Sequence, residues 1–334
     1  MDFPRAPLVS AVTPIEHLPR LSEALGISLH IKRDDLAGTT MGGNKSRQLE
    51  YYLGAAQKAQ AQTVLITGAV QSNFVRTAAA SAAKLGMKTI VQLEDRVPLT
   101  DALYGANGNV LLSRLLGAEV MRYPVGEDEA GADAALRARA AEEEEAGRTP
   151  YVIPLALGNA PLGALGYMRA AEEILSQDAG FDVIVVASGS GLTHAGLLHG
   201  LRQAGHPARV IGSCVRRDAT QQQARLRQVL DALAGMTGTD AVQDADITVW
   251  DGALSPGYGQ LGTAAAQAMA MMAQTEGIIL DPVYTAKVFA AVPALVACGD
   301  ITATERVLFV HTGGLASLFA YQSALENAFP APEV

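Results

Sequence analysis

The stretch Met41-Gly42-Gly43-Asn44-Lys45-Ser46-Arg47 places a single lysine directly after two glycines, where a helix predicted over about residues 46–60 begins. Glycines let the backbone pass close to a bound group. A lysine at such a corner can reach inward, and a lysine amine is a nucleophile once its environment has activated it. Lys45 is therefore the candidate reactive amine.

Composition and charge narrow the possible functions. The chain has 334 residues, of which 49% are hydrophobic, enough for one large or two ordinary domains with a substantial core. The formal net charge of −9 argues against a nucleic-acid partner, because binding nucleic-acid phosphates takes clustered Lys and Arg. Cys214 and Cys298 are far apart in the sequence, so neither a disulfide framework nor a cysteine zinc site is indicated.

The expected location is the cytoplasm, without membrane contact. The segment from Met1 to Pro7 lacks the basic start and apolar core of a signal peptide, and no uncharged apolar run reaches membrane-spanning length. The six histidines show no His-Glu-x-x-His pattern, so no metal site is expected. His194 and His199 are interpreted as packing or supporting groups.

Short apolar runs alternate with helical patterns along the chain. This alternation is typical of an α/β protein with largely parallel sheets, whose functional residues gather where strands end in polar or glycine-rich turns. Strands are predicted at residues 28–32, 64–66, 88–93, 119–123, 151–154, 182–187, 209–215, 277–280 and 306–310.

The turn Gln71-Ser72-Asn73 follows one of these strands and precedes an alanine-rich helix predicted over about residues 74–85. Ser72 or Asn73 can cap this helix, which these residue types do well. The same helix N-terminus, with exposed amides and two short polar side chains, can also bind a carboxylate. Both roles can hold at once.

A second turn, Ser188-Gly189-Ser190-Gly191-Leu192-Thr193, follows a continuous apolar strand and precedes an amphipathic helix. Its small residues expose successive amides, which predicts a phosphate site. The turn is no Walker loop, and His194 stands where the dinucleotide fingerprint has its third glycine. Arg216-Arg217 after the next strand leaves an NADP-dependent reductase as a remote alternative.

Two tyrosines stand in tight turns of the last third of the chain. Tyr258 lies in Ser255-Pro256-Gly257-Tyr258-Gly259, and Tyr284 lies in Asp281-Pro282-Val283-Tyr284-Thr285. Taken alone, each is more often a packing residue whose hydroxyl finds a partner. A further glycine-rich loop at residues 157–166 contains Asn159 and indicates another place where the backbone approaches a bound group.

Together these motifs resemble the pyridoxal-phosphate family of D-cysteine desulfhydrase and 1-aminocyclopropane-1-carboxylate (ACC) deaminase. The resemblance covers nearly the whole chain, and six ordered motifs are far more specific than any one of them. The six are Lys45 after Gly42-Gly43-Asn44, Gln71-Ser72-Asn73, residues 188–193 with His194-Ala195-Gly196, Gly257-Tyr258-Gly259, Leu280-Asp281-Pro282-Val283-Tyr284-Thr285, and His311-Thr312-Gly313-Gly314.

The resemblance implies a fold-type II, tryptophan synthase β-like enzyme with two domains, each an open, mostly parallel sheet flanked by helices. The large domain would comprise residues 1–47 and 161–334, and a small domain at residues 48–160 would be inserted into it. A homodimer is usual for the family.

The resemblance also implies a role for each site residue. Lys45 would carry pyridoxal phosphate, Asn73 would hydrogen-bond its phenolic oxygen, and Thr285 or Thr312 would face its pyridine nitrogen. The phosphate would be bound by Ser188, Gly189, Ser190, Gly191, Leu192 and Thr193. The substrate would be bound by Gln71, Ser72, Asn73, Asn159, Tyr258 and Tyr284.

The expected reaction is α,β-elimination on a small β-substituted amino acid, with D-cysteine giving pyruvate, sulfide and ammonia as the leading case. Lys45 would be the base, Tyr284 or Tyr258 would assist proton transfer or the leaving group, and Ser72 is the alternative proton shuttle.

Substrate identity is not decided by the motifs. Thr285 stands where ring-opening members of the family have an acid, and a neutral hydroxyl stabilises a protonated pyridine less, which favours simple elimination. Phe74 and the loop Ala156-Leu157-Gly158 depart from the family pattern. Another substrate such as L-cysteate, an ACC-deaminase-like activity, and a pyridoxal-phosphate-binding protein without turnover therefore stay open.

Overall fold

The computed structural model describes residues 3–330, which form two compact units. The first unit comprises residues 9–48 and 160–314, and the second comprises residues 3–8, 49–159 and 315–330. Helix α2 (Asn44–Lys58) begins in the first unit, and its residues from Leu49 onward belong to the second.

The two ends of the described chain belong to the second unit, whereas the family resemblance implies that both lie in the large domain. Residues 3–8 are held there by the Arg5–Glu50 ion pair of 2.8 Å and by the hydrogen bond from Ala6 N to Glu50 O. Near the other end, the ring of Tyr321 packs edge-on against Tyr104. The limits of an inserted folding domain at residues 48–160 stay a prediction.

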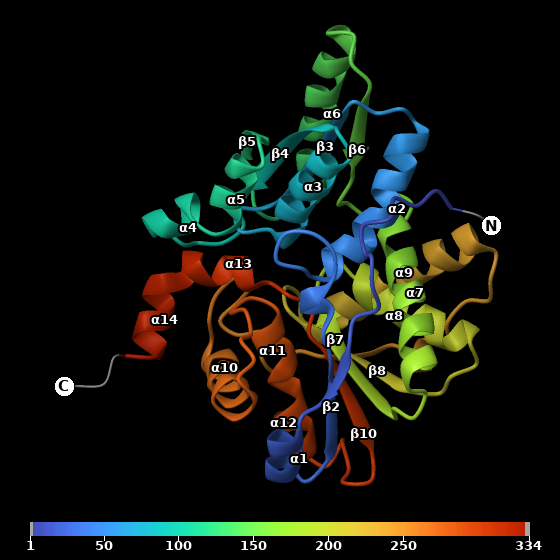
Figure 1. Cartoon of the computed structure of the whole chain (residues 1–334), viewed down its shortest axis with the longest axis vertical. Coiled ribbons are helices and arrows are strands. Elements are labelled where there is room, and N and C mark those ends of the chain that lie inside the picture. Colours follow the sequence, from blue (N-terminus) through green and yellow to red (C-terminus); the bar gives the residue numbers. More distant parts are fainter. Residues whose placement is uncertain (1–2, 331–334) are drawn as a thin grey trace. The chain divides into compact units, whose positions relative to one another are not determined.

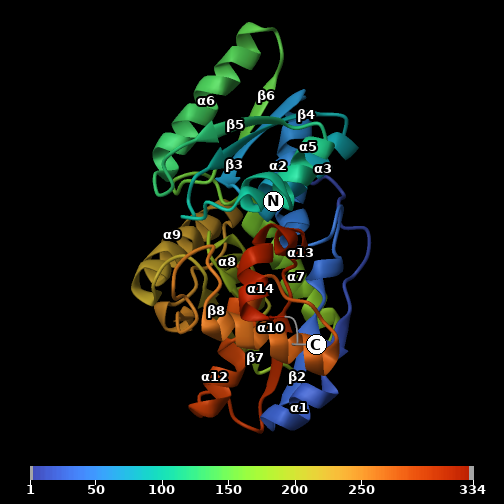
Figure 2. The ribbon, with the colours of Figure 1, turned by 90° about the vertical axis from the view of Figure 1, so that its left-hand side faces the viewer.

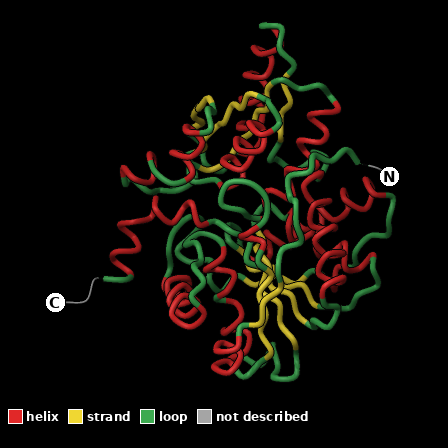
Figure 3. Tube along the Cα trace, in the orientation of Figure 1, coloured by secondary structure: helices red, strands yellow, loops and turns green. Residues whose placement is uncertain are grey.

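The first unit contains a six-stranded sheet in the order β1-β2-β10-β7-β8-β9. Only β1 pairs antiparallel with its neighbour, and the other four pairings are parallel. Figure 3 shows these strands in yellow as the central layer of the unit. The strands are β1 (Ile15–His17), β2 (Ser28–Lys32), β7 (Val183–Ser188), β8 (Arg209–Cys214), β9 (Thr248–Trp250) and β10 (Arg306–Val310).

Helices cover both faces of this sheet (Figure 1). Three of them, α7 (Leu162–Gln177), α8 (Leu192–Gln203) and α9 (Ala219–Thr237), share one buried apolar cluster with strands β7, β8 and β10. Because all six residues of β7 are buried, its continuous apolar sequence is explained by helices on both faces. The remaining helices are α1 (Pro19–Leu25), α10 (Thr263–Glu276), α11 (Thr285–Phe289), α12 (Ala291–Ala297) and the 3-10 turns η1 (Asp34–Leu36) and η2 (Asp244–Asp246).

The second unit contains a four-stranded, wholly parallel sheet in the order β5-β4-β3-β6. Figure 2 shows α6 on one face of this sheet and α3 and α5 on the other. The strands are β3 (Thr63–Ala69), β4 (Lys88–Glu94), β5 (Glu119–Tyr123) and β6 (Pro150–Ile153). The helices are α3 (Asn73–Lys84), α4 (Ala102–Ala106), α5 (Asn109–Leu115), α6 (Glu129–Glu145), α13 (Leu315–Leu318), η3 (Phe319–Tyr321) and α14 (Gln322–Ala328).

The strand predicted at residues 277–280 is wrong, because this segment has no regular secondary structure. Gly277 ends α10 in the left-handed conformation, and the Asp281 side chain accepts from Tyr284 N in the next turn. Only three residues lie between Gly277 and Asp281. Ile279 is 47% exposed, which is incompatible with a buried strand. None of the helices between residues 3 and 330 combines the length and apolar character that crossing a bilayer requires.

Candidate active site

Lys45 is the second residue of α2, and its amine lies 3.2 Å from Gln48 Oε1. The residue is half-buried, and burial of the amine lowers its pKa to about 8. Gly42 must be glycine here, because it has a φ of +60° and a Cβ would lie 1.6 Å from Asp35 O. The glycine corner therefore presents an amine with an appreciable neutral fraction near pH 8.

The turn from β7 to α8 has the features of an anion site. Gly191 is the N-cap residue of α8 with a φ of +98°, and it offers no side chain to cap the helix. Among residues 3–330, the amide nitrogens of residues 189–193 donate no hydrogen bond to the protein. Arg217 and Arg225 donate to the carbonyl oxygens of Gly189 and Ser190, at 3.2 and 2.9 Å. The amides thus stay available beside two positive charges.

Thr193 connects this turn to Lys45. Asn44 Nδ2 and Gln48 Nε2 each donate to Thr193 Oγ1 at 2.8 Å. Asn44 and Gln48 are four residues apart on α2, so they lie on one face of the helix and flank Lys45. Within the first unit, the structure therefore brings the predicted amine and the predicted phosphate turn together.

Ser188 ends β7, and its place among the phosphate-binding residues stays a prediction. It is fully buried, and its hydroxyl lies 3.2 Å from His194 Nδ1 and 2.9 Å from Gln222 Nε2. Burial lowers the pKa of His194 to about 4, so this ring is neutral and packs in the interior. The Ser188 side chain therefore links the end of β7 to His194 of α8 and Gln222 of α9 in the interior.

The two threonines predicted near a pyridine nitrogen differ in their hydrogen bonds. Thr285 Oγ1 donates to Asp281 Oδ1 at 2.7 Å and accepts from Asp281 N at 2.8 Å. Within the described residues, the hydroxyl of Thr312 has no hydrogen-bond partner, while its carbonyl accepts from Asn44 N at 3.1 Å. Thr312 therefore lies beside the glycine corner with its hydroxyl uncommitted.

The two predicted tyrosines form a pair in the first unit. Their hydroxyl oxygens are 2.6 Å apart and their rings are T-shaped, with centroids 6.2 Å apart. The Arg216 guanidinium lies 5.9 Å from the centre of the Tyr258 ring. Such a short contact between two hydroxyls can pass a proton from one to the other.

In the second unit, Ser72 is the N-cap residue of α3, and its hydroxyl accepts from Val75 N at 3.3 Å, which confirms the predicted cap. Gln71 is used inside the unit: its Nε2 donates to Tyr104 O and its Oε1 accepts from Asn109 N, at 2.6 and 2.9 Å. Asn73 Oδ1 accepts from Asn109 Nδ2 at 3.0 Å. This cluster, Gln71, Ser72, Asn73 and Asn109, surrounds the start of α3.

Asn159 lies outside that cluster. Its Nδ2 donates to Ala156 O at 3.0 Å and its Oδ1 accepts from Arg137, so both ends of the amide bind within the loop and to α6. Its place among the substrate residues stays a prediction.

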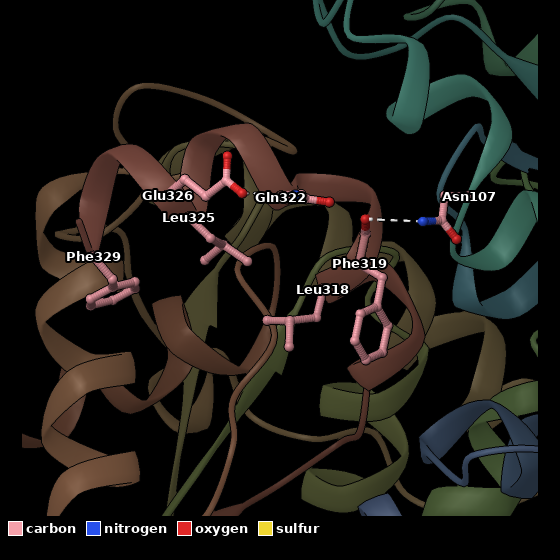
Figure 4. A pocket seen from close by; sticks show the side chains of 7 residues that line it. All are labelled: Asn107, Leu318, Phe319, Gln322, Leu325, Glu326 and Phe329. Carbon is pink, nitrogen blue, oxygen red and sulfur yellow. Dashed lines mark hydrogen bonds between the residues drawn. The ribbon is translucent and has the colours of Figure 1, made fainter. Parts of the chain in front are cut away.

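A cavity of about 360 Å³ in the second unit is formed by the last helices of the described chain (Figure 4). None of the predicted site residues, all of which lie within residues 3–330, lines it. Its walls are Asn107, Leu318, Phe319, Gln322, Leu325, Glu326 and Phe329.

The predictions from sequence missed several residues that contact predicted site residues within their own unit: Asn44, Gln48 and Arg225 in the first, and Asn109 in the second. Asn44 and Gln48 could have been found from their four-residue spacing around Lys45. Arg225 and Asn109 act across long sequence separations, and no local pattern marks them. Their partners appear only once α9 and the loop before α5 are in place.

The donor groups fit pyridoxal phosphate. Uncapped amides with two arginines suit its phosphate, and a half-buried amine of lowered pKa suits its aldehyde. The hydroxyl of Thr312 suits its ring nitrogen. Thr193 Oγ1 accepts from Asn44 and Gln48, which links the helix that carries Lys45 to the turn before α8.

Comparison with known proteins gives the same assignment. The family model described as pyridoxal-phosphate dependent enzyme matches residues 8–313. D-cysteine desulfhydrase of Salmonella choleraesuis (strain SC-B67) is 42% identical over 322 residues, 96% of each chain. The crystal structure of an ACC deaminase homologue, 37% identical, superposes with a TM-score of 0.87 over 98% of this chain and 97% of that chain.

Threonine deaminase isoform 2 of Solanum lycopersicum, 17% identical, shares the fold with a TM-score of 0.66 over 96% of this chain and 84% of that chain. These matches confirm the predicted α/β fold of type II, the predicted cofactor and the resemblance that the motifs carry. The chain belongs to the family of pyridoxal-phosphate-dependent enzymes.

Proposed function

We propose that the protein is a D-cysteine desulfhydrase, which converts D-cysteine and water into pyruvate, hydrogen sulfide and ammonia. The observation that carries the chemistry is the Lys45 amine, with its pKa lowered to about 8 and its helix bound through Asn44 and Gln48 to the uncapped start of α8. The choice of substrate is supported by the relatives named D-cysteine desulfhydrase, which match over 96% of this chain.

Lys45 has two tasks in this proposal. It binds the cofactor, which supplies an electron sink for the charge that develops at the substrate Cα. Its amine then holds the proton taken from Cα, which a lysine can do near neutral pH when burial lowers its pKa. The amides of residues 189–193 and the Thr193 hydroxyl hold the phosphate.

The Tyr258–Tyr284 pair is proposed to deliver a proton to the departing sulfur. Because the two hydroxyl oxygens are 2.6 Å apart, one tyrosine can give its proton and regain one from the other. Ser72 is the alternative proton carrier.

Ser72 and Asn73 are proposed to meet the substrate carboxylate and the phenolic oxygen of the cofactor, respectively. The Ser72 oxygen accepts from Val75 N, which leaves the hydroxyl hydrogen to donate. Gln71 acts indirectly, since both ends of its amide hold the loop of residues 104–109.

Thr312 is proposed as the contact of the pyridine nitrogen. Thr285 has already given its hydroxyl hydrogen to Asp281, which makes it the weaker candidate. A hydroxyl leaves the ring less firmly protonated than a carboxylate would, and this favours elimination of a good leaving group such as sulfide.

Ring opening of ACC is the second candidate, favoured by the TM-score of 0.87 to an ACC deaminase homologue. A homodimer in the cytoplasm is proposed with the leading function, on the basis of the family resemblance. Sedimentation equilibrium of the purified protein tests the dimer.

The test is incubation of the purified protein, with pyridoxal phosphate, on D-cysteine, L-cysteine, L-cysteate, β-chloroalanine and ACC in turn. Sulfide, sulfite, ammonia and keto acids are measured, and Lys45→Ala is the control. We expect sulfide and pyruvate in equal amounts from D-cysteine. Sulfide no higher than in the control overturns the proposal. Cofactor absorbance without keto acid from any substrate identifies a binding protein without turnover.

A further inference from the structure

We propose that Asn109 is a positioning residue that fixes the direction of the Asn73 side-chain amide, with Arg76 as its anchor. The inference rests on the proposed function, in which Asn73 donates a hydrogen bond to the phenolic oxygen of the cofactor. Asn109 and Arg76 are 1% and 0% exposed, so both act from inside the second unit.

The orientation of the Asn109 amide is determined by two neighbours that can each play only one role. Arg76 Nε is a donor and lies 3.1 Å from Asn109 Oδ1. The backbone oxygen of Gln71 is an acceptor and lies 3.1 Å from Asn109 Nδ2. Reversing the amide would set donor against donor and acceptor against acceptor, so one orientation remains.

This orientation determines that of Asn73. Asn109 Nδ2 lies 3.0 Å from Asn73 Oδ1, so the oxygen of Asn73 faces Asn109 and its NH2 group faces away. Among residues 3–330, that NH2 group donates to no other residue. Asn73 thus keeps two hydrogens for a ligand, and a phenolic oxygen is an acceptor that they suit.

Hydrogen bonds also fix the backbone of Asn109. Its amide donates to Gln71 Oε1 at 2.9 Å, while Gln71 Nε2 donates to Asn107 O at 3.0 Å. Gly108 has a φ of +59°, and a Cβ there would lie 2.6 Å from Gln71 Oε1. The loop therefore accepts only glycine before Asn109, and Gln71 acts on the site through this loop.

Arg76 adds charge to the same chain of contacts. Burial lowers the pKa of its guanidinium to about 10, so it stays protonated at neutral pH. A positive group that donates to Asn109 Oδ1 polarises the amide and strengthens donation by Nδ2.

The test is Asn109→Asp in the full-length protein with pyridoxal phosphate. A carboxylate of the same size keeps an acceptor for Arg76 but has no donor, so Asn73 must turn its NH2 group toward residue 109 and present its oxygen to the cofactor. We expect the visible absorption band and its pH dependence to move as they do in Asn73→Ala, and cofactor affinity to fall about tenfold.

Asn107→Asp is the matched control, because it makes the same chemical change two residues away, where the side chain contacts Phe319 O and Gly108 N. Its spectrum should equal that of the unchanged protein. If Asn109→Asp fails to fold, Asn109→Ala replaces it.

An altered spectrum in Asn73→Ala with an unaltered spectrum in the folded Asn109 variant overturns the inference. An unaltered spectrum in Asn73→Ala itself instead removes the role proposed for Asn73. The two failures are therefore distinguishable.

Discussion

Helices α2 and α11 each carry a lysine whose pKa burial lowers to about 8, yet the two lysines stand in different surroundings. Lys287 is fully buried, and its amine donates to Leu254 O and Gly257 O at 3.0 and 2.6 Å. Lys45 is half-buried and meets the side-chain amide of Gln48.

A lowered pKa therefore does not identify the reactive amine. Two backbone carbonyls can only accept, so they hold Lys287 as a donor that fixes the loop before Tyr258. Lys45 keeps part of its surface accessible, and its neighbours Asn44 and Gln48 connect it to the phosphate turn. Access and neighbours therefore favour Lys45 over Lys287 in the proposed role of the cofactor-binding amine.

Removing each amine in turn tests most strongly whether Lys45 and Lys287 have different roles. Lys45→Ala should lower turnover of D-cysteine about 10³-fold or more, because the base is lost. Thermal unfolding of the cofactor-free variant should stay cooperative. Turnover within tenfold of the unchanged protein would contradict the assignment.

Lys287→Met should act on stability first. Two buried carbonyls lose their donor, which should lower the free energy of unfolding by about 2–5 kcal/mol in urea titrations. Turnover at low temperature, where the variant is folded, should fall far less than in Lys45→Ala. A loss equal to that of Lys45→Ala would mean that Lys287 acts directly in the reaction.

The pH dependence of stability sharpens the comparison further. The folded cofactor-free protein holds the Lys45 proton less tightly than the unfolded chain, whose pKa is near 10.5. The unfolded state thus binds more protons between pH 8 and 10.5, and stability due to Lys45 rises with pH across this window.

Below pH 8 the Lys45 amine is charged in the folded state, and the full cost of burying that charge opposes folding. Methionine carries no charge, so cofactor-free Lys45→Met should be more stable than the unchanged protein by about 1–3 kcal/mol. This advantage should shrink toward pH 10.5, as measured by urea unfolding in a pH series. A difference that does not depend on pH would mean that the pKa of Lys45 is not lowered.

The smallest expected effect separates the two roles of Ser72. Ser72→Ala should cost about 1 kcal/mol of stability through the lost cap, and Ser72→Gly only a few tenths. Both variants lack the hydroxyl, so both should raise KM for D-cysteine by the same factor if Ser72 binds the carboxylate. If KM rises in Ser72→Ala but hardly in Ser72→Gly, as the stability loss does, Ser72 acts only as a helix cap.

The sequence predicts those parts of the site that local chemistry marks. The glycine corner before Lys45, the small-residue turn before α8 and the Ser72 cap each need particular residue types at adjacent positions, so they can be read directly. Alternating apolar runs likewise predict the parallel sheets.

Other parts depend on contacts between distant segments. Arg225 donates to Ser190 O and Asn109 donates to Asn73 Oδ1 across more than thirty positions each, so no local pattern marks either contact. Residues 315–330 belong to the second unit, where Tyr321 packs against Tyr104 and Asn107 donates to Phe319 O, contacts that span more than two hundred positions. Such long-range choices are decided by packing.

The most direct test of the account is reduction of the pyridoxal-phosphate-loaded protein with borohydride, followed by proteolysis and mass spectrometry. The account predicts the reduced cofactor adduct on the peptide that contains Lys45, with Lys287 unmodified. An adduct on Lys287, or on any peptide other than that of Lys45, would contradict it.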